Sequence, residues 1–169
     1  AGDFFVDVLF TIYDAVIWVW PDNKIEVNYG LATALDPGYS NDHNRRPVLT
    51  LDNCDIFSCD YLWKGIEMGS KTTLIIKNDS RIEDAEKAVY AINTNGVILD
   101  ITETTFNRNL NGIYLSNGSF FLHDPIFKKF KGNSFSCTSA LTASTYIEYD
   151  NKSSETGIYL NNINANIGS

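Results

Sequence analysis

Carboxylates at close spacing are the residues of this sequence that come nearest to a known catalytic arrangement. Glycoside hydrolysis uses two carboxyl groups about 5 to 10 Å apart, one of them with a raised pKa. Asp84 and Glu86 have a suitable spacing, and Asp60 precedes them by about one repeat of the chain. All three stand in polar stretches that predict corner loops, where acidic side chains are ordinarily solvated. We therefore assign no catalytic residue from the sequence.

Nucleophilic and metal chemistry find less support. The only histidines are His43 and His123, and neither lies near a Gly-x-Ser-x-Gly elbow. Cys54 and Cys59 are separated by four residues, but no second Cys or His pair follows at the spacing of zinc ligands. We predict no metal site and no cofactor, although the acidic composition leaves Ca²⁺ open.

The three cysteines, Cys54, Cys59 and Cys137, cannot all pair within one chain. Cys54 is predicted to be packed at an inward or corner position. Cys59 could approach Cys137 only if their two corners coincide. One disulfide with one buried thiol and three buried thiols both stay open.

Aromatic residues in a recurring context offer a different chemistry, the stacking of sugar rings. Tyr90, Tyr114 and Tyr159 each follow a small residue and then an aliphatic one. If the aliphatic residues face a core, the tyrosines face outward. Such rings stack on one another and stabilise a sheet, or they form a platform for sugars with hydrogen bonds from Lys87 and Asn111. Both interpretations stay open at this point.

The elements that position these residues belong to a repeat. Four segments share an order of polar, small, aliphatic, outward-looking and apolar residues: 64–68, 87–91, 111–115 and 156–160. From Gly65 to Ala88 is 23 positions, from Ala88 to Gly112 is 24, and from Gly112 to Gly157 is 45. The last interval predicts two repeats of about the same size, which puts Tyr159 two repeats beyond Tyr114.

A second element recurs in phase with the first. The segments 49–51, 74–76 and 98–101 begin at intervals of 25 and 24 positions. Each leads through a polar corner to a short apolar strand, around Ile56, Ile82 and Phe106. Two independent elements in one register indicate a real period.

This period predicts an all-β fold, a right-handed parallel β-helix with coils of about 24 residues and three short strands per coil. The units hold β-branched and aromatic runs of about 3 to 5 residues between Asn, Asp, Gly and Ser corners, and no stretch has convincing helical periodicity. A leucine-rich repeat would need regular leucines and helical halves. The predicted inward stack along the axis is Ile66, Val89, Ile113 and Ile158.

The 169 residues predict one domain, 1–169, with two parts. Residues 1–48 are expected to form irregular entry coils, with a projecting loop at 31–47. Their predicted strands are 5–8, 10–12, 16–19 and 24–27. Residues 49–169 are expected to form the regular coils, with an elaborated coil at 120–133 and a loop at 150–155.

Charge narrows the choice of partners. Thirteen Lys and Arg stand against twenty-one Asp and Glu, a net charge of -8, which opposes binding to nucleic acid or to anionic membranes. The most apolar stretch, 4–20, contains Asp7 and Asp14, so we predict no membrane insertion. It also lacks the features of a signal peptide, so the chain reads as a mature or excised segment.

The carboxy-terminal end raises the question of how the repeat stops. Residues 158–167 still read as repeat, and an open solenoid end presents unpaired strand edges and apolar core. We therefore expect the stack to continue in a longer chain or to abut a partner, including by end-to-end self-assembly.

A known family resembles parts of this chain. The run 59–66, Cys-Asp-Tyr-Leu-Trp-Lys-Gly-Ile, is similar to the Cys…Trp-x-Gly-Ile signature of parallel β-helix regions in large secreted surface proteins of type IX-secreting bacteria of the Bacteroidetes kind. Segments 24–27 and 49–51 resemble the strands that precede the signature in that family, and 82–85, 106–109, 133–137 and 157–168 its later corners and end. The resemblance covers roughly residues 20–169 and rests on structural motifs. The loop at 31–47 departs from it, and no carboxy-terminal sorting domain is visible.

The resemblance implies an extracellular, adhesive or structural module and supplies no catalytic residues. Our leading hypothesis is a non-enzymatic scaffold, secreted or on the cell surface, for adhesion or assembly with polysaccharide or other surface proteins. The alternative is a pectate-lyase-like polysaccharide lyase or glycoside hydrolase. An enzyme predicts a cleft with converging carboxylates, whereas a scaffold predicts dispersed acids.

Overall fold

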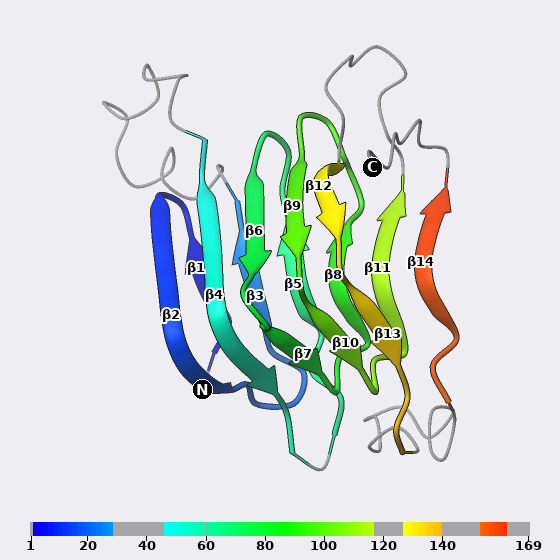
Figure 1. Ribbon diagram of the computed structural model, residues 1–169. Helices are drawn as coiled ribbons and strands as arrows, with labels where there is room; N and C mark the ends of the chain where they lie inside the picture. Colours follow the sequence, from blue (N-terminus) through cyan, green and yellow to red (C-terminus); the bar gives the residue numbers. More distant parts are fainter. Residues whose placement is uncertain (1, 29–45, 60, 117–126, 140–152, 162–169) are drawn as a thin grey trace.

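The computed structural model of this chain is built from β-strands (Figure 1). It describes residues 2–28, 46–59, 61–116, 127–139 and 153–161. Within these ranges all the regular elements are strands, and every strand pairing is parallel. No helix in the described ranges is long and apolar enough to cross a membrane. The fold is therefore all-β, with parallel sheets only.

The chain runs through the two sheets in turn several times, and we call each such turn a pass. One sheet has six strands and takes a single strand from each pass. Its strands follow chain order across the sheet: β1 (Phe4–Val6), β3 (Lys24–Val27), β5 (Gly65–Met68), β8 (Lys87–Ala91), β11 (Asn111–Ser116) and β14 (Thr156–Asn161). The predicted inward stack is present, because Ile66 pairs with Val89, Val89 with Ile113 and Ile113 with Ile158.

The second sheet has eight strands and is strongly curled. The first half of β4 pairs with β6 and its second half pairs with β7, so β6 and β7 together match one long strand. In the same way β9 precedes β10, and β12 precedes β13. The strands are β2 (Leu9–Trp18), β4 (Val48–Phe57), β6 (Thr73–Lys77), β7 (Arg81–Glu83), β9 (Ile98–Thr102), β10 (Thr105–Asn107), β12 (Phe127–Lys131) and β13 (Ser134–Ser136).

The bend of the curled sheet coincides with residues in the left-handed backbone region. Asp14, Asn53, Asn78, Glu103 and Gly132 occupy equivalent positions and all have positive φ, between 49° and 68°. Glycine, Asn and Asp adopt this conformation at the lowest cost. The Asn53 side-chain amide also donates to Asp14 Oδ1 at 2.8 Å, which links two neighbouring corners.

Apolar side chains from both sheets fill the space between them. Leu49, Leu74 and Leu99 form one column of this core, and all three are fully buried. The largest fully buried side chain is that of Trp63, whose indole N–H donates to the carbonyl of Glu83 at 2.8 Å. Figure 1 shows the two sheets one behind the other, with the strands progressing from blue to red across the view.

Three expectations about the period need correction. Leu74 pairs with Leu99, so the second element recurs at 25 positions in both steps. β11 pairs directly with β14, so the 45 positions from Gly112 to Gly157 make one step, with additional chain between the strands. Tyr159 therefore lies beside Tyr114 instead of two repeats beyond it. The long interval was interpreted as two repeats, but two strands can pair directly whatever the length of the chain between them.

Strand lengths also differ from the expectation. The predicted strands 10–12 and 16–19 fall largely within β2, a single strand of ten residues that pairs with β4 along its whole length. Passes containing β2 or β4 thus use one long strand where later passes use two short ones. Most of the predicted loop at 31–47, and parts of the elaborated coil at 120–133 and of the loop at 150–155, lie outside the described residues.

Candidate functional site

The outer face of the six-stranded sheet carries a continuous row of large side chains. Because side chains alternate along a strand, the neighbours of Ile66, Val89 and Ile113 face away from the core. Parallel pairing aligns one such residue from each strand. We call this set the outer row: Phe5, Glu26, Glu67, Tyr90, Tyr114 and Tyr159. All three tyrosines predicted from the sequence belong to it.

Tyr114 and Tyr159 form the aromatic end of the outer row. Their ring centroids are 4.6 Å apart and their planes meet at 11°. The ammonium of Lys87 lies 4.6 Å from the Tyr114 centroid and 5.6 Å from that of Tyr90. Two rings stacked this closely leave no room for an ammonium between them, so Lys87 covers the opposite face of Tyr114. Tyr159 is the most open of the three tyrosines, with 38% exposure.

Tyr90 and Asn111 are more enclosed than the sequence suggested, each with 8% exposure. The Tyr90 hydroxyl donates to Glu67 Oε2 at 2.9 Å. Burial, and then this hydrogen bond, raise the pKa of Tyr90 far above its usual value. Of the five predicted ligand-binding residues, Tyr159 is thus the one best placed to meet a ligand.

The other end of the outer row is ionic and was not anticipated. The Lys24 ammonium lies 2.7 Å from Glu26 Oε2 and 2.6 Å from Glu67 Oε2. Burial acts to raise the pKa of Glu26, but hydrogen bonds from Lys24 and Asn28 outweigh it and hold the pKa below its usual value. This cluster escaped detection because 41 positions separate Ile25 from its partner Ile66, which hides the phase of the repeat.

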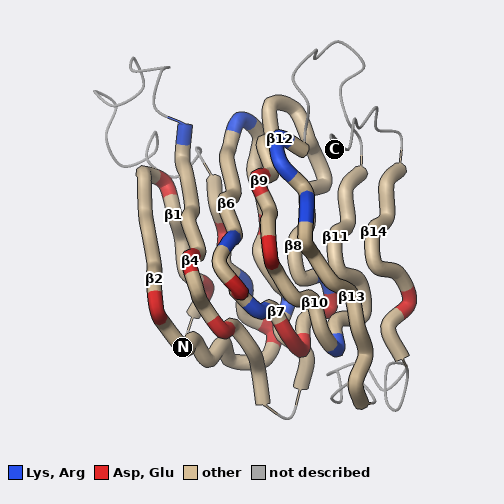
Figure 2. The backbone as a smooth tube through the Cα atoms, in the orientation of Figure 1, with Lys and Arg blue, Asp and Glu red and all other residues tan. Residues whose placement is uncertain are grey.

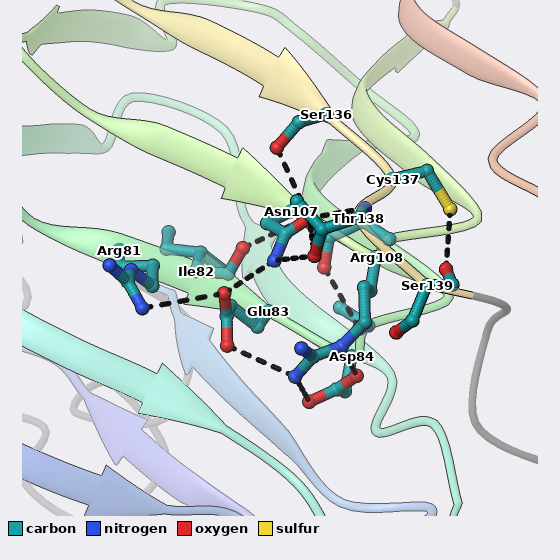
Figure 3. A network of polar contacts seen from close by, with 12 residues as sticks. Arg81, Ile82, Glu83, Asp84, Asn107, Arg108, Ser136, Cys137, Thr138 and Ser139 are labelled. Carbon is teal, nitrogen blue, oxygen red and sulfur yellow. Dashed lines mark hydrogen bonds and ion pairs between the residues drawn. The ribbon is translucent and has the colours of Figure 1, made fainter.

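Asp84, one of the acidic residues considered for catalysis, belongs to a different cluster (Figure 3). Asp84 is nearly inaccessible, and both of its carboxylate oxygens accept 2.8 Å hydrogen bonds from Arg108. The same guanidinium reaches Glu83 Oε2 at 3.1 Å. The hydrogen bond to Asp84 is the largest cause that raises the pKa of Arg108, and the charges of Asp84 and Glu83 add to it while burial opposes it. A carboxylate held in this way is a poor candidate for proton transfer to a ligand.

The network continues into the next pass of the chain through Asn107. Its amide donates to Glu83 Oε1 at 2.7 Å, and its carbonyl accepts from Ser136 Oγ and from the Thr138 backbone, each at 3.1 Å (Figure 3). Three successive passes are thus joined by one buried and two partly buried hydrogen bonds, which is a structural role.

Glu86 lies apart from this network and is half-buried. Burial is the main cause that raises its pKa, and Asp22 adds to the effect while Lys87 and Lys64 oppose it. A raised pKa suits a general acid, but Asp84, its predicted partner, is engaged with Arg108. Asp60, His43 and His123 lie outside the described residues.

The cysteines and the acidic residues give no metal centre in the described part of the chain. Cys54 is buried, Cys137 is intermediate and Cys59 is exposed, and all three are free thiols. The expected packing of Cys54 is confirmed, and neither a disulfide nor a set of three buried thiols is present. Among the residues described, no group of three His, Cys, Asp or Glu side chains could hold a metal ion.

The outer face of the eight-stranded sheet offers a second surface to compare. A shallow groove of about 550 Å³ there is lined by both signs of charge, Lys77, Lys129 and Lys131 with Asp100 and Glu103. Figure 2 shows basic and acidic positions interspersed along the described strands. The groove has no aromatic side chain in its lining, so it lacks a stacking surface.

Comparisons with models of protein families, with curated proteins and with solved structures found no match. The site must therefore be interpreted from its own geometry. That geometry is an ordered aromatic pair at one edge of a parallel sheet, followed by an enclosed tyrosine and an ionic cluster.

Proposed function

We propose that the chain is a right-handed parallel β-helix that acts as a non-enzymatic scaffold outside the cell and binds polysaccharide at the aromatic end of the outer row. The helix is supported by the parallel pairings in both sheets, where five of the twelve pairings between described strands join partners 23 to 25 positions apart. The two sheets also share one core. The hand follows from the strong preference of parallel crossovers for right-handed connections.

The observation that carries the binding proposal is the ordered pair of Tyr114 and Tyr159. Tyr114 holds the Tyr159 ring nearly parallel at 4.6 Å, which fixes a flat aromatic surface at a strand edge. The apolar face of a sugar ring packs on such a surface, and its hydroxyls then need polar partners at the rim. The Lys87 ammonium, 4.6 Å from the Tyr114 centroid on the opposite face of that ring, places a positive charge beside the aromatic pair.

An extracellular location, secreted or on the cell surface, is supported by the net charge of -8 and by the resemblance to secreted β-helix regions. An acidic surface stays soluble and avoids nucleic acids. In this setting the partners are polysaccharides and other surface proteins.

A polysaccharide lyase or glycoside hydrolase is the second candidate. The raised pKa of Glu86 is the observation in its favour, because a glycosidase acid needs one. The hydrogen bonds of Asp84 to Arg108 argue against the expected pairing of carboxylates.

A glycan array tests the proposal, with the chain compared against Tyr159→Ala and Tyr13→Ala. Tyr13 is 71% exposed and lies on β2, so its replacement controls for loss of an exposed tyrosine. We expect Tyr159→Ala to weaken saccharide binding by roughly tenfold, since a stacked aromatic contact contributes about 0.5 to 1.5 kcal/mol beyond the area it buries, and Tyr13→Ala to leave it unchanged. Binding to no saccharide, or equal binding by both variants, would overturn the site.

Two further measurements separate the alternatives. Loss of binding in Lys129→Ala, with Tyr159→Ala unaffected, would move the site to the groove of the eight-stranded sheet. Release of new reducing ends or unsaturated products from any bound polysaccharide, abolished in Glu86→Gln, would establish the enzyme instead.

A further inference from the structure

Exposed apolar side chains gather at the two ends of the strand stack. Within the described residues, all the large exposed hydrophobic side chains except Tyr61 and Ile92 belong to the first or the last pass of the chain. At the first end Phe4, Phe5 and Trp18 are 44%, 47% and 54% exposed. At the other end Phe135, Tyr159 and Leu160 are 36%, 38% and 38% exposed: three more apolar side chains at a sheet edge.

The first end also has unused backbone hydrogen-bonding groups. Among the described strands, β1 pairs only with β3 and β2 pairs only with β4, so each keeps one free edge. Between these two strands lies an apolar cavity of about 420 Å³ whose lining includes Phe4, Phe10 and Trp20. A free parallel edge beside an apolar opening is the profile of a strand-pairing surface.

The last end presents edges of the same kind. In the described part of the chain β14 pairs only with β11, β12 only with β9 and β13 only with β10. A cavity of about 210 Å³ opens there, lined by Phe106, Phe135 and Gly157 among others. Within each sheet the strands at both ends run in the same direction, so one end could pair with the other by parallel continuation of both sheets.

We propose that the protein self-assembles head to tail, with β14 and β13 of one copy pairing with β1 and the second half of β2 of the next. Continuing the observed register, Ile158 meets Phe4, Tyr159 meets Phe5 and Leu160 meets Val6. Every one of these contacts joins two apolar or aromatic side chains.

The same register matches the curled sheet. The column that contains Ile56, Ile82 and Phe106 begins with Ile17 and ends with Phe135, so the Phe135 ring of one copy would cover Ile17 of the next. Phe106 and Phe135 already stack in this way within one chain, with ring centroids 4.9 Å apart. Phe127, at the far end of β12, is buried, so the interface is expected to centre on β13 and β14.

Charge favours this pairing of unlike ends. β12 carries three lysines and no acid, whereas β2 carries Asp14 and no base (Figure 2). Continued register brings Lys131 of one copy beside Tyr13 of the next. Lys87 and Tyr114 show the same kind of contact inside the chain, at 4.6 Å.

Such an interface uses two different surfaces and therefore propagates into an open fibre. The inference rests on the β-helix of the proposed function and is independent of its saccharide. It adds one constraint, because the Tyr159 ring that stacks on Phe5 in the fibre is the same ring that would receive a sugar. Saccharide binding is then confined to the last copy of each fibre.

Sedimentation analysis of two one-sided variants tests the pairing. Phe5→Arg blocks the first end and Leu160→Asp blocks the last, both at exposed positions, while Ile92→Lys is a matched control 57% exposed and remote from both ends. We expect the unmodified chain and the control to grow in mass with concentration. Each blocked variant should stay monomeric, and an equimolar mixture of the two should stop at the dimer.

The outcomes divide clearly. A monomeric unmodified chain at all concentrations, or growth of either blocked variant alone, would overturn the proposal. Circular dichroism and thermal unfolding of each variant establish that it is folded before its mass is interpreted. A chain that binds glycan but stays monomeric at all concentrations would overturn assembly while leaving the saccharide proposal intact.

Cross-linking gives the register independently. In a Cys59→Ser, Cys137→Ser background, Phe5→Cys combined with Tyr159→Cys should give a disulfide-linked ladder on oxidation. The mismatched pair Ile92→Cys with Tyr159→Cys should give none. Dimers from Phe5→Cys alone would indicate pairing of like ends and would overturn the head-to-tail arrangement.

Discussion

One column of inward-facing apolar residues runs from the first edge of the strand stack into its middle. Its residues are buried in the middle of the stack and exposed at the edge. Leu49, Leu74 and Leu99 are fully buried, whereas Phe10, which pairs with Leu49, is 39% exposed. The chemical character of the column does not change between these positions. What changes is the number of neighbouring strands, so the exposure of the first pass reflects a missing neighbour and not a polar sequence.

This comparison also explains why interior positions tolerate less change. A residue between two paired strands has backbone and side chains on both sides, and a residue on an edge strand has them on one side only. Equivalent substitutions in the middle and at an edge should therefore differ in their effect on the free energy of unfolding.

The largest difference is expected for two glycines of the six-stranded sheet. Gly65 has φ of +105°, and a Cβ there would lie 1.6 Å from the Lys87 carbonyl oxygen. For Gly157, on the edge strand β14, the three atoms nearest to such a Cβ all belong to the Phe135 side chain, the first of them at 3.3 Å. Gly65→Ala should cost about 3 to 5 kcal/mol through strain and a displaced β8, and Gly157→Ala about 1 kcal/mol, by urea unfolding. Equal costs would contradict the comparison.

The core column itself should give the next largest difference. Leu74→Ala leaves a cavity enclosed by strands on both sides and should lower the free energy of unfolding by about 3 kcal/mol. Phe10→Ala removes a larger side chain but an exposed one, and should cost about 1 kcal/mol or less. The same urea series checks both. A greater cost for Phe10→Ala would show that the first end is covered by other residues or by another copy of the chain.

A smaller difference should separate an enclosed ion pair from a surface one. Arg108→Met leaves the Asp84 carboxylate, only 2% exposed, without its partner, and should cost about 2 to 3 kcal/mol. Lys77→Met removes the 2.9 Å contact with Asp52, where the side chains are 40% and 26% exposed, and should cost less than about 1 kcal/mol. Thermal unfolding in low and high salt checks this, because salt should reduce only the contribution of Lys77. A similar salt effect on Arg108→Met would contradict its enclosure.

The sequence predicted correctly those features that do not depend on the length of the loops between strands. Alternation of side chains within a strand is unaffected by loop length. The inward stack of Ile66, Val89 and Ile113 and the alignment of Tyr90 with Tyr114 were therefore predicted correctly. Spacing across a loop varies with that length, since closing a longer loop costs little additional free energy and leaves the pairing unchanged. Tyr159 was therefore expected two repeats away from its actual neighbour.

The polar clusters were missed for a different reason. Asp84 and Arg108 are 24 positions apart, which is one repeat, but the repeat interval was not applied to charged residues. Lys24 and Glu67 were hidden by the long interval between β3 and β5. Pairing of opposite charges at the repeat interval is a signal that could have found the first cluster, and only the structure could reveal the second.

The smallest expected effect is on the pH dependence of the free energy of unfolding, and it distinguishes two glutamates, Glu86 and Glu26. Burial raises the pKa of Glu86 above its ordinary value of 4.5, so its contribution favours folding below that pH and is lost as pH rises through the folded-state pKa. The pKa of Glu26 is lowered from 4.5, although burial opposes this, because Lys24 and Asn28 donate to it. Its contribution is therefore present above pH 4.5 and is lost as pH falls through the folded-state pKa.

The two amide variants should consequently differ in sign. At pH 7, Glu86→Gln should be slightly more stable than the unmodified chain and Glu26→Gln less stable, each by below about 1 kcal/mol, because both sites are partly solvated. The gain of Glu86→Gln should vanish as pH falls below 4.5, and the loss of Glu26→Gln should shrink as pH falls further. Urea unfolding between pH 3.5 and pH 7.5 measures both trends. If both variants lose stability at pH 7, then Glu86 is held by its lysine neighbours more strongly than burial opposes it, and the half-buried carboxyl has no reason to stay protonated near a bound saccharide.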